Sequence, residues 1–591
     1  MVLWNPRAAD AARPGVPKKD PMRLPVTRLI LIGCTAMASS AMRASADIER
    51  VIRLTQSPSR YERTDFVVVL TADWSDPCRS EDVRLDMRLR SPSEKTVIVP
   101  AFLVRGSSGR PSVWSARYAP GEVGSYRGSF ELVDGAGGRA TAPISFAVST
   151  SPSKGFLHAA GPWVLRFDDG TPFRGLGENL CWESRSTDDS RHFKDLQQSQ
   201  RFNYDYMLGA LASAGGQFTR IWMCPWNLPL EWRKVSRDTD RYRDDPGHFN
   251  PSAIDRMDRL VESLEAADVY AMLTLESHVA LLGAGWDSSN YNLLNGGPCA
   301  EPGDFFTNAA AKAQFKNRLR YVVARWGYST HLAAWEFFNE VDNAMYGQKP
   351  NRIPDADVTA WHREMGAYLK GLDPYGHLIT TSTSHRPVEG LNQIEAFDFN
   401  QLHIYRRTGT IASAIRQSVQ AEGKPCVVGE FGFEWDWSKD FNAFAWDMDN
   451  DFKEGAWLGL FSPTPVMPMS WWWEFFDERG MTGALAQIRE VSDRMLKAGD
   501  GAFAEVPCSA QGLTCLAVRC GSTTFVYLSN PSREPRSGRP QVNIRHAATV
   551  DTLNPDARTQ SAAPADAQAD GSLRLPVYAL GPGQRRILEI R

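Results

Sequence analysis

The sequence lacks the long run of basic residues that marks most nucleic-acid-binding proteins. Its formal net charge is −3 over 591 residues, and Lys and Arg are spread along the whole chain. A nucleic-acid partner is therefore not expected. None of the nine cysteines forms a CxxC pair, and the sequence indicates no metal site. What remains is an ordinary globular composition, 42% hydrophobic and 23% charged, in a chain long enough for three or four domains.

The chain also lacks a hydrophobic run long enough to cross a membrane as a stable helix. The nearest candidate, residues 29–42, is too short for a span. It follows two arginines and precedes the small residues Ala44, Ser45 and Ala46, an order that is typical of a secretory signal. We therefore expect residues 1–46 to be a signal region whose true start is Met22. The protein is then expected in the periplasm, outside the cell or on the outer surface of a bacterium.

The cysteines allow two further predictions, each with an open alternative. Residues 31–34 resemble a bacterial lipobox, so a lipid anchor on Cys34 is the alternative to simple export. Export permits disulfides, and Cys508, Cys515 and Cys520 lie close together in the sequence. One bridge among these three is expected, and buried free thiols are the alternative.

Short strand-like runs dominate both ends of the chain. Gly, Pro, Ser and Asp bound those before residue 153, which predicts an immunoglobulin-like β-sandwich over 47–152. A second set predicts a C-terminal β-sandwich over 498–591, with a loose loop at 561–570. We expect both sandwiches to brace the central domain, and glycan binding is the alternative role. The predicted strands are 66–70, 83–89, 96–103, 112–118, 124–133, 513–518, 523–528 and 541–545.

Between the two sandwiches, strands alternate with amphipathic helices such as 252–267 and 309–325. Eight strands in such an alternation predict a central (β/α)8 TIM barrel over 153–497, so the fold class is a multidomain chain with a barrel flanked by sandwiches. An open doubly wound sheet is the runner-up, but Gly175 and Gly177 are not followed by the third glycine of a nucleotide-binding turn. The predicted barrel strands are 174–181, 218–224, 269–275, 332–338, 378–382, 399–404, 426–430 and 467–473.

Polar and aromatic residues follow these central strands directly, where a structural loop would more often carry Gly, Ser or Asp. Because a barrel enzyme collects its reactive groups at the carboxyl ends of its strands, these residues are the candidates for an active site. They are Asn179, Trp182, Arg220, Trp222, His278, Asn339, Glu340, His385, His403, Tyr405, Glu430, Trp471 and Trp473.

Glu340 and Glu430 are the two carboxyl groups that glycoside hydrolysis needs. Strands four and seven can place them about 5–5.5 Å apart across the barrel mouth, the spacing of a retaining mechanism. We expect Glu340 to act as general acid and then base, which requires a raised pKa. Glu430 is expected to be the ionised nucleophile, supported by Arg220, His403 or Tyr405.

The remaining candidates are expected to contact the sugar. Asn339 is placed to hold the substrate 2-hydroxyl, and Trp473 is expected to form the floor under the reacting ring. In an extended strand Trp471 shares a face with Trp473, whereas Trp472 points away into packing. The other predicted sugar contacts are Arg220, Trp471, His278, Asn179, Trp182, His403 and Tyr405. A structural role is the alternative for each histidine and for Arg220, and it is the expected role of Glu336 and Glu474.

Two motifs carry a resemblance to a known group of enzymes. "WEFFNE", which ends in Asn339 and Glu340, resembles the acid/base motif of the clan A glycoside hydrolases, and "CVVGEFGF" around Glu430 resembles their nucleophile motif. The resemblance covers about residues 174–490, and "TRIWM", "LHIY" and "SWWWEFFD" resemble the accessory motifs. It implies a retaining glycosidase without a cofactor, acting on an oligo- or polysaccharide. The region before it resembles an uncharacterised module that often precedes such barrels in bacteria.

Three alternatives remain open at this point. The chain could be a clan A enzyme for an unusual furanoside or deoxy-sugar, or a carbohydrate-binding surface protein on an inactive barrel. The intact pair of glutamates argues against the inactive barrel. A polysaccharide lyase is disfavoured, because its site usually centres on Tyr, His and Arg or on a metal.

Overall fold

The computed structural model describes residues 46–591, apart from 185–201, 236–240, 348–351, 437, 545–548, 554–559, 563–565 and 568–571. The predicted signal region before Ala46 and the lipobox Cys34 lie outside the described residues. Within the described part of the chain, no helix has both the length and the apolar character that a membrane crossing requires.

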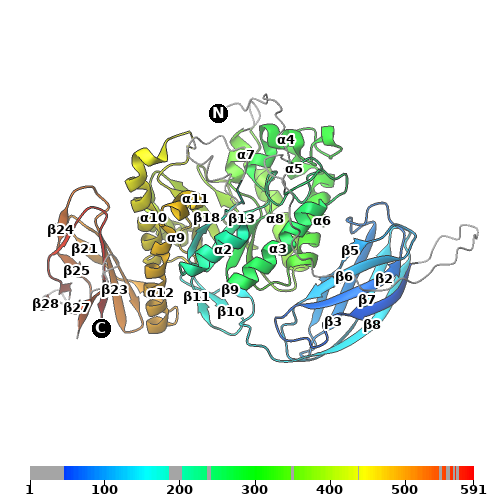
Figure 1. Ribbon diagram of the computed structural model, residues 1–591, viewed down its shortest axis with the longest axis horizontal. Coiled ribbons are helices and arrows are strands. Elements are labelled where there is room, and N and C mark those ends of the chain that lie inside the picture. Colours follow the sequence, from blue (N-terminus) through cyan, green and yellow to red (C-terminus); the bar gives the residue numbers. More distant parts are fainter. Residues whose placement is uncertain are drawn as a thin grey trace, which may run out of the picture. The chain divides into compact units, whose positions relative to one another are not determined.

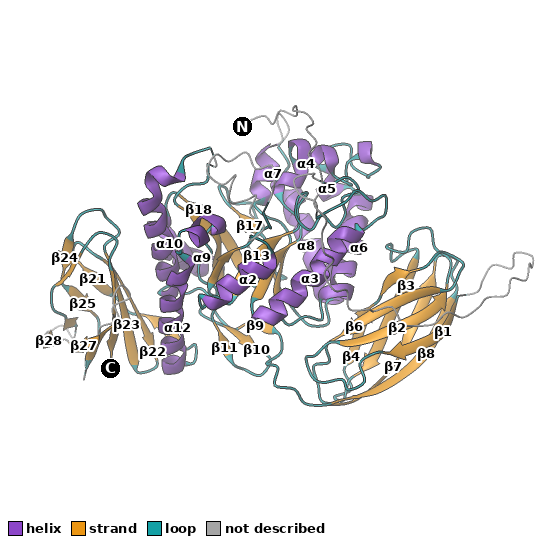
Figure 2. Cartoon of the chain, viewed as in Figure 1, coloured by secondary structure: helices purple, strands orange, loops and turns teal. Residues whose placement is uncertain are grey.

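The N-terminal region is built from two four-stranded antiparallel sheets (Figures 1 and 2). Alternate residues of β2 and β3 are buried, as expected for strands with one face on a core. Phe66 of the first sheet contacts Phe130 and Phe146 of the second at ring distances of 5.9 and 5.4 Å, so the inner faces meet. The first sheet has the order β1 (Asp47–Arg53), β2 (Thr64–Thr71), β6 (Ser112–Tyr118), β5 (Phe102–Arg105), and the second β4 (Thr96–Pro100), β3 (Val83–Arg90), β7 (Gly124–Asp134), β8 (Arg139–Val148).

The central region begins with a small antiparallel sheet and continues as parallel strands. The small sheet contains β9 (Leu157–Ala159), β10 (Leu165–Phe167) and β11 (Pro172–Phe173). Bridges from Ser470 to Glu178 in the first parallel strand and to Phe431 in the last one join the two ends of the series. The parallel strands are β12 (Gly177–Asn179), β13 (Phe218–Trp222), β14 (Tyr270–Thr274), β15 (Leu332–Glu336), β16 (Leu378–Thr380), β17 (Ser382–Thr383), β18 (Asn400–Tyr405) and β19 (Cys426–Gly432).

The helices between these strands form where the sequence supplies caps and an apolar stripe. Asn250 caps α3 and Asn308 caps α6, each accepting two backbone N–H groups. The two helices predicted at 252–267 and 309–325 are confirmed as α3 and α6. The helices of the central region are α2 (Tyr204–Ser213), α3 (Pro251–Ala267), α4 (Gly283–Ser288), α5 (Asp304–Thr307), α6 (Ala309–Trp326), α7 (Val341–Gly347), α8 (Asp355–Leu372), α9 (Ile411–Glu422), α10 (Ala445–Leu460), α11 (Trp473–Glu478) and α12 (Leu485–Gly499).

The strand predicted at 467–473 is wrong. In its place the chain makes isolated bridges at Val466 and Ser470, Trp472 adopts a left-handed backbone with φ 66°, and α11 begins at Trp473. A short, mostly apolar run fits a buried turn as well as a buried strand, because its periodicity does not distinguish them. The strand alternation that placed Trp471 and Trp473 on one face is therefore not the reason for their positions.

The C-terminal region is again rich in β-strands. Two of them, β27 (Gln560–Ala562) and β28 (Asp566–Ala567), lie where a loose loop was predicted, so that prediction is wrong for these residues. The six-stranded sheet has the order β20 (Phe503–Glu505), β22 (Thr514–Cys520), β23 (Thr523–Ser529), β31 (Arg585–Ile590), β26 (Val550–Leu553), β27. A four-stranded sheet has the order β21 (Cys508–Ala510), β25 (Pro540–Val542), β29 (Leu573–Arg574), β28. A two-stranded sheet pairs β24 (Arg536–Gly538) with β30 (Tyr578–Leu580).

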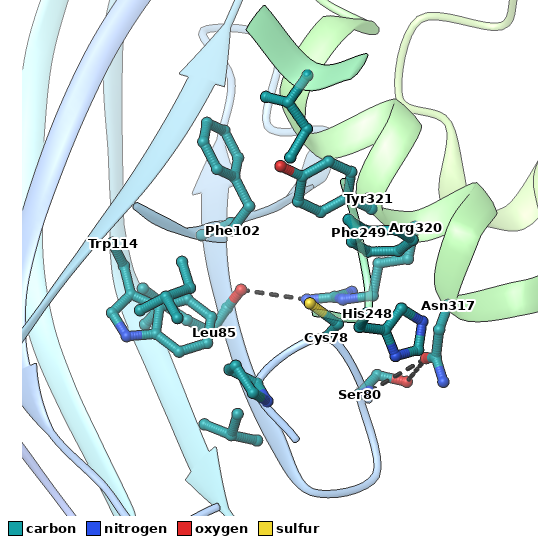
Figure 3. Close-up of a pocket in the computed structure, with 15 residues that line it drawn as sticks. Cys78, Ser80, Leu85, Phe102, Trp114, His248, Phe249, Asn317, Arg320 and Tyr321 are labelled. Carbon is teal, nitrogen blue, oxygen red and sulfur yellow. Dashed lines mark hydrogen bonds between the residues drawn. The ribbon is translucent and has the colours of Figure 1, made fainter. Parts of the chain in front are cut away.

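The N-terminal sheets contact the central region through α6. Arg320 of α6 donates to the carbonyl of Leu85 at 3.1 Å, and the N–H of Ser80 donates to Asn317 Oδ1 at 3.1 Å. Beside these contacts lies a cavity of about 180 Å³ lined by Phe102, Trp114 and other mostly apolar side chains (Figure 3). Such contacts suit the bracing role that the sequence predicts for this region.

Candidate active site

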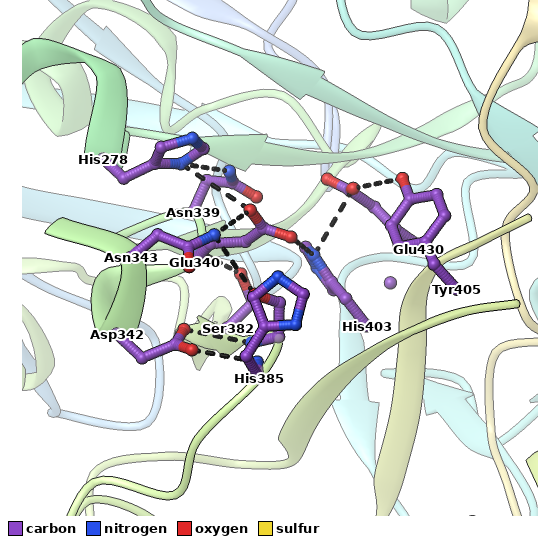
Figure 4. A network of polar contacts seen from close by, with 12 residues as sticks. His278, Asn339, Glu340, Asp342, Asn343, Ser382, His385, His403, Tyr405 and Glu430 are labelled. Atoms are coloured by element: carbon purple, nitrogen blue, oxygen red, sulfur yellow. Dashed lines mark hydrogen bonds and ion pairs between the residues drawn. The ribbon is translucent and has the colours of Figure 1, made fainter. Parts of the chain in front are cut away.

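Glu340 and Glu430 face each other at the carboxyl ends of two strands on opposite sides of the parallel series (Figure 4). Glu340 lies between β15 and α7, and Glu430 belongs to β19. One carboxylate oxygen of each and a ring nitrogen of His403 all lie within 4.8 Å of one another. This separation is close to the about 5–5.5 Å that a retaining double displacement requires.

Glu340 occupies a strained position whose neighbours hold it. Its backbone is left-handed, with φ 49°, a conformation that side chains other than Gly adopt rarely and at a cost. Its N–H donates to Ser382 Oγ at 3.0 Å, and Asn343 Nδ2 donates to its Oε2 at 2.8 Å. The backbone is thus turned so that the carboxylate points toward Glu430 rather than along α7.

Glu430 is held by two donors. Arg220 Nη1 donates to its Oε1 at 2.6 Å and Tyr405 Oη donates to its Oε2 at 2.8 Å. Arg220 also forms a bidentate ion pair with Glu336, at 2.6 and 2.7 Å, so Glu336 has the structural role expected of it. The guanidinium therefore serves both as an ion-pair partner and as the group that orients Glu430.

His403 connects the two carboxylates. Its Nδ1 lies 2.9 Å from Glu340 Oε1 and 3.4 Å from Glu430 Oε2. Burial alone would raise the pKa of Glu340, but the hydrogen bond and charge of His403 lower that pKa to about 2. Burial raises the pKa of Glu430, against the opposing effects of His403 and Arg220. The raised pKa that the sequence predicts for Glu340 is therefore wrong for this structure, because the hydrogen bond and charge of His403 outweigh the effect of burial.

Asn339 and His278 lie beside Glu340. Asn339 Oδ1 accepts from Arg220 Nη2 at 2.6 Å, and its Nδ2 lies 3.1 Å from His278 Nδ1. His278 Nδ1 is 3.8 Å from Glu340 Oε2. Because Arg220 fixes the amide oxygen of Asn339, the amide nitrogen faces the side of the site where Glu340 lies.

Four tryptophans form a cluster next to the carboxylates. Trp182 contacts Trp471 and Trp473 edge to face, with ring centroids 5.4 and 5.1 Å apart, and it also contacts Trp222. The left-handed turn at Trp472 sends that side chain elsewhere, where its Nε1 donates to the carbonyl of Glu434 at 2.6 Å. Trp471 and Trp473 thus lie together, as the sequence predicts, although through a turn.

Asn179 takes a position that differs from the one expected. Its Nδ2 donates to the carbonyls of Gly429, Met469 and Ser470 at 3.0 to 3.2 Å, and the residue is fully buried. These bonds join β12 to β19 at the point where the parallel series closes. The geometry therefore favours a structural role for Asn179 over the predicted sugar contact.

Several residues of the site carry no clear signal in the sequence. Asn343 follows Glu340 by three residues on the first turn of α7, a spacing that places two side chains on one helix face. Ser382 reaches the site from β17, which only the fold reveals. Asp342 accepts the N–H groups of Ser384, His385 and Arg386. The side chain of His385, a predicted site residue, is exposed.

Among the described residues, one group brings three possible metal ligands together, and it is Glu340, His403 and Glu430. Arg220 donates to Glu430 within this group, and Asn343 donates to Glu340. A guanidinium at 2.6 Å already supplies the positive charge that a cation would bring to Glu430. The arrangement suits two carboxyl groups that a histidine bridges.

Comparison with known proteins gives the class of this domain. Residues 183–451 match the family model described as cellulase, glycosyl hydrolase family 5. This part of the chain is similar to a glycoside hydrolase domain. The matched family is family 5 of clan A, so the resemblance inferred from the two motifs is confirmed. A domain of this family implies a (β/α)8 barrel, and β-rich regions lie N-terminal and C-terminal to it.

Curated relatives match part of the chain. Mannan endo-1,4-beta-mannosidase A of Podospora anserina is 27% identical over 267 residues, which cover 39% of this chain and 65% of that protein. The enzyme of the same name from Aspergillus aculeatus is 30% identical over 158 residues, 22% of this chain and 39% of that protein. The chain thus spans less than two thirds of either relative.

A solved structure agrees over most of the fold. A putative glycoside hydrolase from Bacteroides vulgatus matches with a TM-score of 0.61 at 13% identity, and the match covers 91% of this chain and 99% of that one. The likeness concerns the fold, because the identity is low.

Proposed function

We propose that the chain is a retaining glycoside hydrolase that cleaves polysaccharides by double displacement. The observation that carries the proposal is the contact set of the two carboxylates. Arg220 and Tyr405 donate to Glu430, whereas Glu340 shares a short contact with His403, a side chain that can carry a proton. Groups that stabilise the charged form suit a nucleophile, and a proton-sharing partner suits an acid and base.

In the first step Glu430 attacks the anomeric carbon while Glu340 gives its proton to the leaving glycosidic oxygen. The carbon–oxygen bond to the leaving sugar breaks and a glycosyl ester to Glu430 forms. In the second step Glu340, now ionised, takes a proton from water as that water attacks the same carbon and releases Glu430. The proton that Glu340 takes from water restores its acid form for the next cycle.

The substrate that we propose is a β-1,4-linked mannan. The support is that the two relatives described above bear the name of endo-acting mannosidases. Trp473 is proposed as the floor of the reacting sugar, with Trp471, Trp182, His278 and Asn339 around it. A glucan, a furanoside polymer or binding without turnover are the alternatives that a test must separate.

The remaining assignments are proposals about the whole chain. We propose a (β/α)8 barrel over 153–497, with β-sandwiches over 47–152 and 498–591 that brace it. We also propose export, with residues 1–46 as the signal region.

The test is Glu340→Gln, assayed on a panel of mannans, glucans and aryl glycosides. We expect the variant to lose turnover of the polysaccharide while it still binds it. Glu478→Gln is the matched control, because Glu478 is an exposed glutamate at the end of α11. Unchanged turnover in Glu340→Gln contradicts the proposal, and a wild-type protein that binds the polysaccharide but cleaves nothing supports the binding protein instead.

A further inference from the structure

An exposed aromatic pair follows the strand that carries Glu430. Phe433 and Trp435 come three and five residues after Glu430, and 37% and 50% of their surfaces are exposed. Large apolar side chains are usually buried, so an exposed tryptophan close in sequence to an active-site glutamate is a candidate for ligand binding. By contrast, Trp471 and Trp473 are only 6% and 4% exposed.

Trp435 is held rigidly although it is exposed. The carboxylate of the buried Glu434 accepts the N–H groups of Trp435 and Asp436 at 2.8 and 3.1 Å, and it pairs with Arg406 and Lys439. These donors outweigh the effect of burial and lower the pKa of Glu434 to about 2. The clamp fixes the backbone that carries the indole, so little conformational entropy is lost when a ligand settles on it.

One face of the indole is already occupied. The guanidinium of Arg406 lies 5.1 Å from the ring centroid of Trp435, and Glu434 orients that guanidinium through a 3.0 Å bond to Nε. A cation over one face is attracted by the ring quadrupole and leaves the opposite face to another partner. The exposed half of the side chain is therefore a flat apolar surface with a defined orientation.

Backbone and side-chain contacts link the segment that carries Trp435 to Glu430 and its neighbours. Arg406 directly follows Tyr405, which donates to Glu430, and the N–H of Arg406 donates to the carbonyl of Gly432 at 2.9 Å. The carbonyl of Glu434 accepts from Trp472, which separates Trp471 from Trp473. The segment that carries Trp435 is thus directly bonded to the segments that carry the groups proposed to contact the reacting sugar.

We propose that Trp435 is a binding platform for a sugar unit of the polysaccharide other than the one that reacts. The inference rests on the proposed function and adds a determinant of substrate length to it. The apolar C–H face of a pyranose ring is a suitable partner for a flat, preoriented indole. The site would favour long chains over short ones, because a single sugar in the reacting position does not reach the platform.

The test compares Trp435→Ala with the wild type on manno-oligosaccharides of two to six units and on an aryl mannoside. If the wild type turns over gluco-oligosaccharides instead, that series and an aryl glucoside are used. We expect kcat/KM for the six-unit chain to fall roughly tenfold, as when one anchoring aromatic is removed, and the aryl glycoside rate to change less than twofold. Trp446→Ala is the matched control, since Trp446 also stacks with an arginine, Arg533, but lies on α10.

Binding gives a readout that does not depend on turnover. Calorimetric titration of the six-unit chain into Glu340→Gln and into Glu340→Gln/Trp435→Ala is expected to show a similar loss of affinity. Glu434→Ala, which frees the loop, is expected to produce part of the loss. Equal length dependence in Trp435→Ala and the wild type overturns the platform and leaves the glycosidase standing. Absence of both cleavage and binding in the wild type instead overturns the proposed function.

Discussion

Arg220 donates a 2.6 Å hydrogen bond to Glu430, and both side chains are almost completely buried. The same guanidinium donates two hydrogen bonds to Glu336, which fix the orientation of the Arg220 side chain. A buried carboxylate remains ionised only when such a partner compensates its lost hydration. The relationship ties the charge of the proposed nucleophile to one residue of β13.

Arg220→Lys tests this relationship. Lysine keeps the positive charge but cannot make the fork-shaped contacts to Glu336 and Glu430 together. We expect kcat to fall roughly a hundredfold and the melting temperature to drop, with the loss of orientation as the cause. Arg325→Lys is the control, because Arg325 pairs with Asp258 away from the carboxylates. Arg325→Lys should lower the melting temperature without changing kcat. A normal kcat in Arg220→Lys would contradict the proposal that Arg220 orients Glu430.

His403→Asn tests the contact between His403 and Glu340. Burial raises the pKa of Glu340, and the hydrogen bond and charge of His403 outweigh it and lower that pKa. In the variant this lowering is lost while Glu340 stays buried, so the pKa of the proposed acid rises. The alkaline limb of the kcat/KM profile is therefore expected to move to higher pH. His385→Asn, a change at an exposed histidine, should leave the limb in place; an unmoved limb in His403→Asn contradicts the idea.

Glu178 gives a prediction about stability. This buried carboxyl of β12 accepts from Thr482 at 3.2 Å through Oε1, and its Oε2 has no hydrogen-bond partner within the described structure. Burial raises its pKa from 4.5 to about 8. Because the folded pKa is raised, its contribution to stability is fully present below about pH 4.5 and declines as the pH rises to about 8.

Glu178→Gln mimics the protonated carboxyl at every pH. We expect the fall in melting temperature between pH 5 and pH 9 to be smaller in this variant than in the wild type, with about 1.4 kcal/mol at stake for each unit of pKa shift. Glu262→Gln, an exposed change on α3, serves as the reference. Identical pH dependence in wild type and Glu178→Gln is the outcome that refutes this explanation.

The bridge predicted among Cys508, Cys515 and Cys520 is not formed in the structure, where all three are free thiols. Cys508 of β21 and Cys515 of β22 are half-buried and close enough to interact, whereas Cys520 is buried. Oxidation by oxidised glutathione is expected to remove two hydrogens and link Cys508 to Cys515, and peptide mass mapping checks this. A bridge that includes Cys520, or no bridge after oxidation, contradicts the pairing.

The sequence predicts the strands and helices of the central region best where hydrophobic periodicity and capping residues indicate the same element. Seven parallel strands and helices α3 and α6 lie close to their predicted positions, because buried strands read as short apolar runs bounded by turn residues. The strand predicted at 467–473 is wrong for the same reason, because a mostly apolar run packs equally well as a buried turn. Ser382 and Trp435 were missed because the first reaches the site only through tertiary structure and the second lies beyond its strand.

Trapping the glycosyl intermediate tests the central claim most directly. A 2-deoxy-2-fluoro glycoside with a good leaving group slows both steps but lets the ester accumulate, and peptide mass spectrometry locates it. The account predicts one added sugar on Glu430, formed in the wild type and absent in Glu430→Gln. A sugar on another carboxylate, or turnover with inverted configuration and no adduct, would contradict it.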